Sequence, residues 1–264
     1  MDEDLRRAQQ ATRQLLESLQ RSGVETLARA KPVDVEPPRN IAEQQPVAAK
    51  DPKADANPDS LFRSDNEVPV LTLDERNEQL KVLNEKVCQC TLCDELATTR
   101  TQTVFGVGNP QTRLLLFGEA PGADEDRQGE PFVGRAGQLL DKIIEACTLK
   151  RSEIYILNVL KCRPPGNRNP TPEESLNCRP FFEKQIEIIR PEFICCLGSI
   201  AAQTLLETKL SIGKLRGRLH PYKWARVLAT YHPAYLLRNP SAKKQVWEDM
   251  QLLLKEMEIE IPAK

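Results

Sequence analysis

The sequence predicts an α/β protein in which helices cover both faces of a four-stranded parallel sheet. Short, β-rich apolar runs alternate along the chain with longer segments whose apolar side chains recur every three or four residues. This alternation is typical of βαβ units, because consecutive parallel strands need a crossover that is usually a helix. The expected strands are Leu114–Phe117, Ile154–Leu160, Phe193–Leu197 and Val227–Thr230.

The expected helices combine apolar periodicity with residues that can cap a first turn. Thr72 or Asp74 can cap the first helix, Thr171 the third and Ser199 the fourth, because their side-chain oxygens accept free backbone N–H groups. The expected helices are Thr72–Cys88, Arg135–Cys147, Pro172–Ile189, Ser199–Leu206 and Pro240–Glu256.

The first 70 residues differ in composition from the rest of the chain. Residues 1–28 carry leucines at roughly helical spacing and form a possible amphipathic helix, either marginal on its own or docked on a protein partner. Residues 29–70 are rich in Pro, Ala, Asp and Glu and nearly lack aromatic residues, so we expect a disordered linker. We expect the folded domain to span residues 71–264.

Composition also restricts the class of protein. No segment approaches the ~18 uninterrupted apolar residues of a membrane span, and the acidic start MDEDLRRAQQ does not resemble a secretory signal, so we expect a cytoplasmic protein without a membrane partner. Residues 1–75 hold 10 basic and 15 acidic side chains, which leaves 27 basic and 23 acidic ones in residues 76–264. This mildly basic body permits binding to nucleic acid but does not by itself argue for it.

Small or polar residues follow each expected strand at its carboxyl end. They are the turn GEAPG at 118–122, Asn158, Gly198-Ser199 and His232-Pro233. Because the carboxyl ends of parallel strands share one edge, where open α/β folds bind ligands, we expect a single site built from four loops.

Three side chains at this edge suit the recognition of a flat polar ring. Phe132, between Pro131 and Gly134, can stack on a base, although it can also be a core residue. Asn158 offers an acceptor and two donors from one amide. Alternatively, this amide can form hydrogen bonds with backbone groups at the end of its own strand. His232 can donate a hydrogen bond to a leaving group that gains negative charge.

The acidic residues after the first strand have three possible roles: solvated charge, activation of a water molecule, or metal binding. They are Glu119, Asp124, Glu125 and Asp126. A phosphate cradle is excluded, because no GK[ST] sequence follows and the negative charge would repel phosphate.

Eight cysteines are many for a cytosolic chain, where stable disulfides are rare. The pairs Cys90-x2-Cys93 and Cys162-x15-Cys178 fit a four-thiolate site for either a [4Fe–4S] cluster or zinc, and Cys88 is an alternative to Cys90. The cysteines in apolar segments are expected in the core: Cys147, Cys195 and Cys196.

Basic residues gather in two of the loops. Arg163 and Arg168 follow Cys162, and Arg238 ends the segment that begins at His232. Leu236 and Leu237 beside Arg238 can wedge into a base stack or pack in the core. We therefore expect DNA contacts at Arg163, Arg168, Leu236, Leu237 and Arg238.

Three motifs resemble a known family. They are GEAPGADEDRQGEPFVGRAGQLLD at 118–141, NVLKCRPPGNRNPTPEE at 158–174 and HPAYLLR at 232–238. Together they closely resemble the iron–sulfur, family 4 uracil-DNA glycosylases of bacteria and archaea, over about residues 86–256. The resemblance implies a three-layer α/β/α fold, DNA that contains uracil as the partner, and removal of uracil as the first step of base-excision repair. We expect a monomer.

The resemblance also implies the roles of individual residues. A structural [4Fe–4S] cluster would bind Cys90, Cys93, Cys162 and Cys178. The uracil-stacking aromatic would be Phe132, the base-reading amide Asn158, the thymine-excluding side chain Glu125 and the catalytic histidine His232. The turn that binds the base would include Gly118, Ala120 and Gly122. Related families place an Asp at the position of Ala120, so the water-activating role falls to Glu119 as the candidate.

The implied reaction starts when deoxyuridine flips out of the base stack. The glycosidic bond then breaks through an oxocarbenium-like sugar, while His232 and backbone N–H groups of the GEAPG turn stabilise the departing uracil anion. Two alternatives stay open from the residues: an iron–sulfur DNA-binding protein without catalytic activity, and a metal-dependent hydrolase that uses the acidic residues.

Overall fold

The computed structural model describes residues 71–260, which belong to the second of the chain's two units, Ser64–Lys264. The helix expected at 1–28 and the linker expected at 29–70 lie outside the described residues, as do the last four residues of the expected domain. Within the described range, every helix is too short or too polar to cross a membrane.

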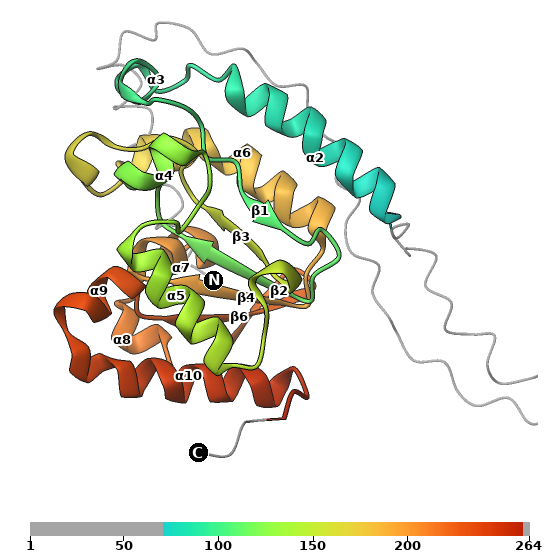
Figure 1. The fold of residues 1–264 in the computed structure, drawn as a ribbon, viewed down its shortest axis with the longest axis vertical. Helices are drawn as coiled ribbons and strands as arrows, with labels where there is room; N and C mark the ends of the chain where they lie inside the picture. The colour runs from blue at the N-terminus through green and yellow to red at the C-terminus, as the bar shows by residue number, and fades with distance from the viewer. Residues whose placement is uncertain (1–70, 261–264) are drawn as a thin grey trace, which may run out of the picture. The chain divides into compact units, whose positions relative to one another are not determined.

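One sheet of six strands, in the order β1-β3-β2-β4-β6-β5, runs through the domain (Figure 1). Its four central strands are parallel, which confirms the predicted sheet. They are β2 (Leu114–Gly118), β3 (Tyr155–Asn158), β4 (Phe193–Leu197) and β6 (Ala225–Thr230). The predicted strand 154–160 is longer than β3, because the chain leaves the sheet after Asn158.

Two antiparallel edge strands were not predicted. The strand β1 (Val107–Gly108) pairs with β3, and β5 (Leu219–Tyr222) pairs with β6. β1 is only two residues long, and no residue of β5 is fully buried, so neither strand carries a hydrophobic pattern that could reveal it.

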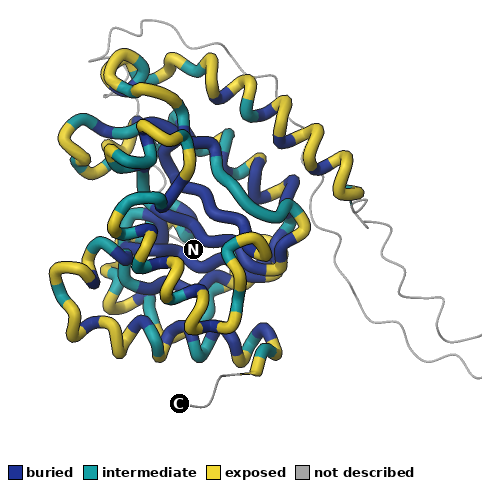
Figure 2. The backbone as a smooth tube through the Cα atoms, viewed as in Figure 1, coloured by how far each residue is buried: buried dark blue, intermediate teal, exposed yellow. Residues whose placement is uncertain are grey.

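Helices cover both faces of the sheet and form the expected three layers (Figure 1). One face is covered by α2 (Leu73–Cys88), α6 (Pro172–Ile189), α7 (Ser199–Leu206) and α8 (Ile212–Leu215). The other is covered by α5 (Arg135–Ala146), α9 (Pro233–Arg238) and α10 (Lys243–Glu256). Figure 2 shows the buried strands between these layers, and their burial on both faces explains why they read as continuous apolar runs.

The shorter elements lie in the loops. They are α3 (Asp94–Thr99), α4 (Ala123–Gln128) and the 3₁₀ turns η2 (Arg151–Glu153), η3 (Pro165–Asn167) and η4 (Pro240–Ala242). The turn η4 takes up the first residues of the helix predicted at 240–256, so that α10 begins only at Lys243.

The predicted caps are right at two helices and wrong at a third. Thr72 and Thr171 each accept a hydrogen bond from the N–H three residues on and form complete capping boxes. Ser199 does not cap α7, because the N-cap position is taken by Gly198 with a φ of 98°. A β-carbon at Gly198 would lie 3.1 Å from Cβ of His232, so the glycine lets the end of β4 approach that histidine closely.

Candidate active site

The carboxyl edge of the sheet carries a pocket with a volume of about 490 Å³. Its walls come from the loops after β2, β3 and β6, as the topology of a parallel sheet requires. The structure brings nine of the predicted residues to this one pocket: Glu119, Ala120, Gly122, Glu125, Phe132, Asn158, Arg168, His232 and Arg238.

Asn158 presents an unpaired acceptor in this pocket. Its side chain is 2% exposed, and its Oδ1 atom is buried without a hydrogen-bond partner. A buried polar oxygen is expensive to leave without a partner, and in a pocket the partner can be a bound ligand. A donor N–H on the ligand therefore fits beside Asn158.

Gly118 makes room for the side chains that would hold such a ligand. It pairs with Asn158 in the parallel register of β2 and β3. A β-carbon at Gly118 would lie 2.1 Å from Oδ1 of Asn158 and 2.7 Å from Cε2 of Phe132. The amide and the aromatic ring can close over this position only because it has no side chain.

We expect Gly118→Ala to abolish most of the activity of this site while the domain stays folded. The added methyl group would displace Asn158 or Phe132, and a misplacement of about 1 Å costs on the order of 100-fold in rate. Steady-state kinetics together with thermal unfolding measures both effects. Gly213→Ala is the matched control, because a β-carbon there meets no atom within 4 Å. Full activity in Gly118→Ala would contradict the geometry described here.

The backbone around Phe132 is held in an unusual conformation. Phe132 is 6% exposed and has a φ of 55°, in the left-handed region that non-glycine residues seldom adopt. The carboxylate of Glu125 accepts the N–H groups of Val133 and Gly134, both at 2.9 Å, and that of Gly122 at 3.0 Å. Glu125 therefore ties the turn after β2 to the loop that carries the aromatic ring.

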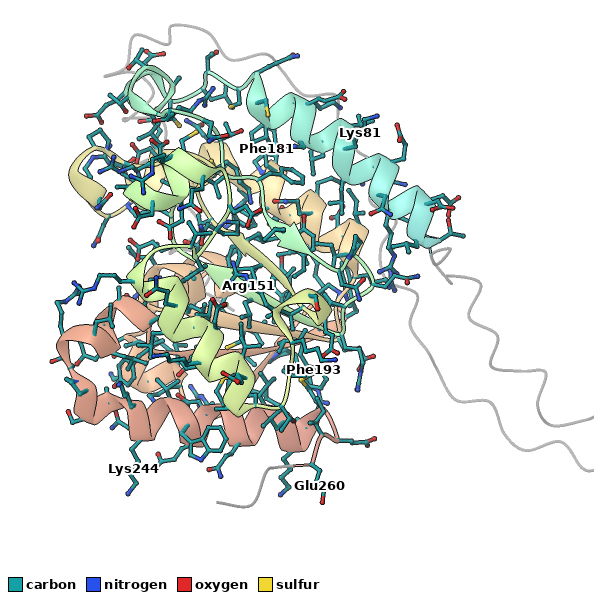
Figure 3. All side chains as sticks on the ribbon, in the orientation of Figure 1. Lys81, Arg151, Phe181, Phe193, Lys244 and Glu260 are labelled. Atoms are coloured by element: carbon teal, nitrogen blue, oxygen red, sulfur yellow. The ribbon has the colours of Figure 1, made fainter. Side chains whose placement is uncertain are left out.

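Arg151, labelled in Figure 3, supports the same loop from its other side. Its Nη2 donates to the carbonyl oxygen of Pro131 at 2.6 Å, and its Nη1 donates to Asp141 on α5 at 2.8 Å. The carbonyl group of Phe132 packs against Gly137, where a β-carbon would lie only 1.8 Å away. The ring of Phe132 is thus fixed before any ligand arrives.

His232 is a neutral hydrogen-bond donor in this arrangement. It caps α9, and its Nδ1 accepts the N–H of Ala234 at 3.1 Å, so the ring proton sits on Nε2. Burial, and next the positive charge of Arg238, lower the pKa of His232 to about 4, while Glu125 acts in the opposite direction. Its ring centroid lies 5.5 Å from that of Phe132, with the two planes inclined by 32°.

The acidic residues after β2 serve mainly the fold. Most of them lie on α4, where a loop was expected. Asp124 pairs with Arg127 at 2.6 Å, and the buried Asp126 accepts the N–H of Thr101 at 3.0 Å. Glu119 lines the pocket together with Asp124 and Glu125, whose carboxylates bind Arg127 and backbone N–H groups, and burial raises the pKa of the Glu119 carboxyl group. It is the acidic side chain best placed to act as a base.

Of the three DNA contacts predicted on α9, one side chain is buried and two are exposed. Leu236 is 1% exposed and packs in the core, which corrects its assignment as a wedge and follows its alternative interpretation. Leu237 is 41% exposed, and Arg238 is exposed at the mouth of the pocket. These two side chains are the parts of the segment that can still meet DNA.

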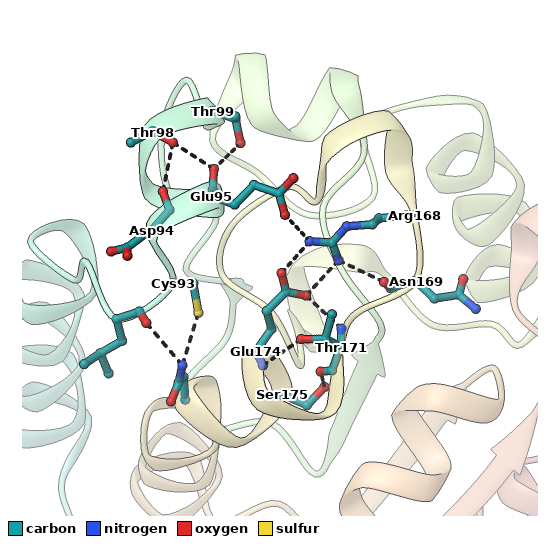
Figure 4. Close-up of polar contacts among 12 residues, drawn as sticks. Cys93, Asp94, Glu95, Thr98, Thr99, Arg168, Asn169, Thr171, Glu174 and Ser175 are labelled. Carbon is teal, nitrogen blue, oxygen red and sulfur yellow. Dashed lines mark hydrogen bonds and ion pairs between the residues drawn. The ribbon is translucent and has the colours of Figure 1, made fainter.

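In the loop after β3, the arginines are engaged within the protein. Arg163 donates to Oδ1 of Asn167 at 2.8 Å. Arg168 makes two bonds to Glu174, at 2.6 and 2.9 Å, and one to Glu95 at 2.6 Å (Figure 4). The hydrogen bond from Arg168 is the main cause that lowers the pKa of Glu174. Arg168 therefore joins α3 to α6 while it lines the pocket.

The four cysteines expected to form one site lie close enough to influence one another. Burial, and then the neighbouring thiols, raise the pKa of Cys162 and bring that of Cys178 to about 12. Cys90 and Cys93 are among the groups that raise the pKa of Cys162. In residues 71–260, however, no three Cys, His, Asp or Glu side chains converge on the position of a single metal ion.

Nitrogen donors point at two of the four sulfur atoms. Nη1 of Arg100 lies 3.0 Å from Sγ of Cys162. Nδ2 of Asn177 lies 3.5 Å from Sγ of Cys93, which is labelled in Figure 4. Donors of this kind stabilise thiolates, the form in which cysteine binds metals.

Three of the four remaining cysteines lie in the core, as expected: Cys147, Cys195 and Cys196 are 0% exposed, and burial raises the pKa of Cys147 to about 12. Cys88, the alternative to Cys90, is exposed at the end of α2. The second histidine, His220, lies on β5, with Nε2 at 2.8 Å from the carbonyl oxygen of Leu215.

Four polar residues that also line the pocket were not predicted as site residues. They are Arg135, Asn167, Asn169 and Tyr235. Tyr235 stacks on Tyr231 with ring centroids 5.1 Å apart and remains 39% exposed. The only signal for it was its place between His232 and Arg238, which does not distinguish a site residue from a surface one.

Comparison with known proteins gives a consistent picture. Residues 105–251 match the model of the uracil DNA glycosylase superfamily. A type-4 uracil-DNA glycosylase of Thermotoga maritima is 45% identical over 182 residues, which are 67% of this chain and 93% of the relative. Proteins of the same description from Archaeoglobus fulgidus and Sulfurisphaera tokodaii are 42% and 40% identical, each over 66% of this chain and over 91% and 83% of their own lengths.

Proposed function

The chain belongs to the type-4 uracil-DNA glycosylases of the uracil-DNA glycosylase superfamily, and on this premise we propose that its pocket excises uracil from DNA. The observation that carries the proposal is the buried, unpaired Oδ1 of Asn158. Uracil offers an N3–H to this acceptor and an O4 atom to the amide's N–H group. Cytosine carries no hydrogen at N3 and has an amino group at position 4, so it would leave the buried amide mismatched.

The other walls of the pocket act on the same ring. Phe132 stacks on uracil, a contact worth about 1–3 kcal/mol per base. Gly118 lets the base approach the sheet, and Glu125 fixes the loop that presents Phe132. Glu125 also lines the pocket, where its side chain would exclude the methyl group of thymine.

Bond cleavage requires stabilisation of negative charge on the base. The bond between C1′ of the sugar and N1 of uracil breaks with its electron pair going to uracil, and C1′ becomes oxocarbenium-like. The neutral His232 donates from Nε2 to the departing anion, and backbone N–H groups of the GEAPG turn add further donors. Water then adds to C1′, and free uracil and an abasic site result.

Glu119 is the candidate that orients this water. Its carboxyl group lines the pocket, and its raised pKa favours uptake of a proton. Ala120 carries no group that could do so. Leu237, exposed beside the pocket, is the candidate for filling the gap left when the nucleotide flips out.

The spacing of the four cysteines fits either zinc or a [4Fe–4S] cluster. The donors at Sγ of Cys93 and Cys162 favour thiolates, and the resemblance to the iron–sulfur, family 4 glycosylases favours the cluster. We propose that Cys90, Cys93, Cys162 and Cys178 hold a [4Fe–4S] cluster, which when bound would supply a structural cross-link between α3, the loop after β3 and α6.

A uracil-release assay on single- and double-stranded DNA, with and without a chelator, tests the function. We expect release of uracil from DNA and retention of activity at chelator concentrations that leave the protein-bound iron in place. DNA binding without release would favour the non-catalytic alternative. Loss of activity while the iron content stays constant would favour a metal-dependent hydrolase.

A further inference from the structure

Lys161 is a buried lysine for which the reaction proposed above has no use. Its side chain is 1% exposed, although the sequence places it among the basic residues that follow β3. Its Nζ donates to the carbonyl oxygen of Asn158 at 2.9 Å and to that of Phe105 at 3.1 Å. One of these two acceptors belongs to the residue that would read uracil.

The hydrogen bond from Nζ of Lys161 to the carbonyl oxygen of Asn158 closes a short loop of the chain between these two residues. Lys161 reaches back three residues to the carbonyl of Asn158. Its carbonyl oxygen accepts the N–H of Val104 at 2.7 Å. Lys161 therefore ties the main chain of Asn158 to Val104 and Phe105 through both its side chain and its backbone.

Both contacts of the Lys161 ammonium group are to main-chain carbonyl oxygens, so removal of this side chain would leave the carbonyl of Asn158 without this buried donor.

We propose that Lys161 is a positioning residue that fixes the uracil-reading amide of Asn158 through its main-chain carbonyl group. This inference rests on the proposed function of the pocket.

The matched control is Gln185, which is fully buried and donates to the same carbonyl of Phe105 at 3.0 Å. Lys161→Met and Gln185→Met each replace one buried polar side chain by an apolar one of similar length. Only the first removes a contact to Asn158. General destabilisation of the core affects both variants, whereas loss of positioning affects only Lys161→Met.

The measurement is the equilibrium affinity of the iron-loaded proteins for a duplex with one 2′-fluoro-2′-deoxyuridine, which resists cleavage, relative to the same duplex with 2′-fluoro-2′-deoxycytidine. We expect this preference to fall about tenfold in Lys161→Met, equivalent to about 1.4 kcal/mol, and to stay unchanged in Gln185→Met. An unchanged preference or an equal loss in both variants would overturn the inference.

Two further variants make the result specific. In an Asn158→Ala background, Lys161→Met should cause no additional loss of preference, and additive losses would contradict action through Asn158. If Lys161→Met does not fold, Lys161→Gln, which is shorter and neutral, should show the same loss.

If Asn158→Ala alone keeps the preference of the wild type, the proposed function fails. If Asn158→Ala loses it and Lys161→Met does not, only the inference fails.

Discussion

Replacement of Asn158 by alanine is expected to lower kcat/KM for uracil excision by about 10²–10³-fold, because it removes a preorganised polar partner of the reacting base. The buried Oδ1 atom has no partner in the free protein, so the variant loses nothing that stabilises the fold through that atom. Thermal stability and affinity for undamaged DNA should therefore be close to those of the wild type. Single-turnover excision and a DNA-binding titration measure the two quantities.

The control for this variant is Asn84→Ala. Asn84 lies on α2, away from the pocket, and its side-chain contact is with Cys88. It should leave excision unchanged. Wild-type rates in Asn158→Ala would mean that the amide does not read the base, and the orphaned oxygen would then have no role in catalysis.

Replacement of His232 by alanine should cause a loss of similar size, about 10²–10³-fold in kcat, since a donor to the departing anion disappears. DNA binding should persist, because the ring lies inside the pocket beside Phe132. Normal excision by His232→Ala would reject the proposed role of the histidine.

The pH dependence follows from the lowered pKa of the same residue. With a pKa of about 4, His232 is neutral in the folded protein throughout pH 5.5–8, so the excision rate should show no step near the ordinary histidine pKa. As the pH falls, His232 is protonated in the unfolded chain at a higher pH than in the folded protein. Stability should therefore decrease as the pH falls from about 6.5 towards 4, and His232→Ala should flatten this part of the profile.

The sequence predicted those features that depend on hydrophobic pattern and strand-end chemistry. Continuous apolar runs such as Phe193–Leu197 marked strands that are buried on both faces, and the parallel topology followed from the helices between them. Once the sheet is parallel, Asn158 and His232 have to meet at one edge, and the structure places both in the same pocket.

Features that depend on tertiary contacts could not be read from the sequence. Leu236 and Leu237 are adjacent and chemically identical, yet one is buried and the other exposed, because only the packing of α9 distinguishes them. In the sequence, Lys161 is one of several basic residues that follow β3, but its length allows the ammonium group to reach two buried carbonyl oxygens. Glu125 carries no sign in the sequence that its carboxylate will bind three backbone N–H groups.

A crystal structure of the protein with DNA that contains uncleavable 2′-fluoro-2′-deoxyuridine tests the central claim most directly. The account predicts an extrahelical uracil stacked on Phe132, with N3–H donating to Oδ1 of Asn158 and Nε2 of His232 facing an oxygen of the base. A uracil bound at another surface, or one that enters the pocket and leaves Oδ1 of Asn158 unpaired, would contradict it.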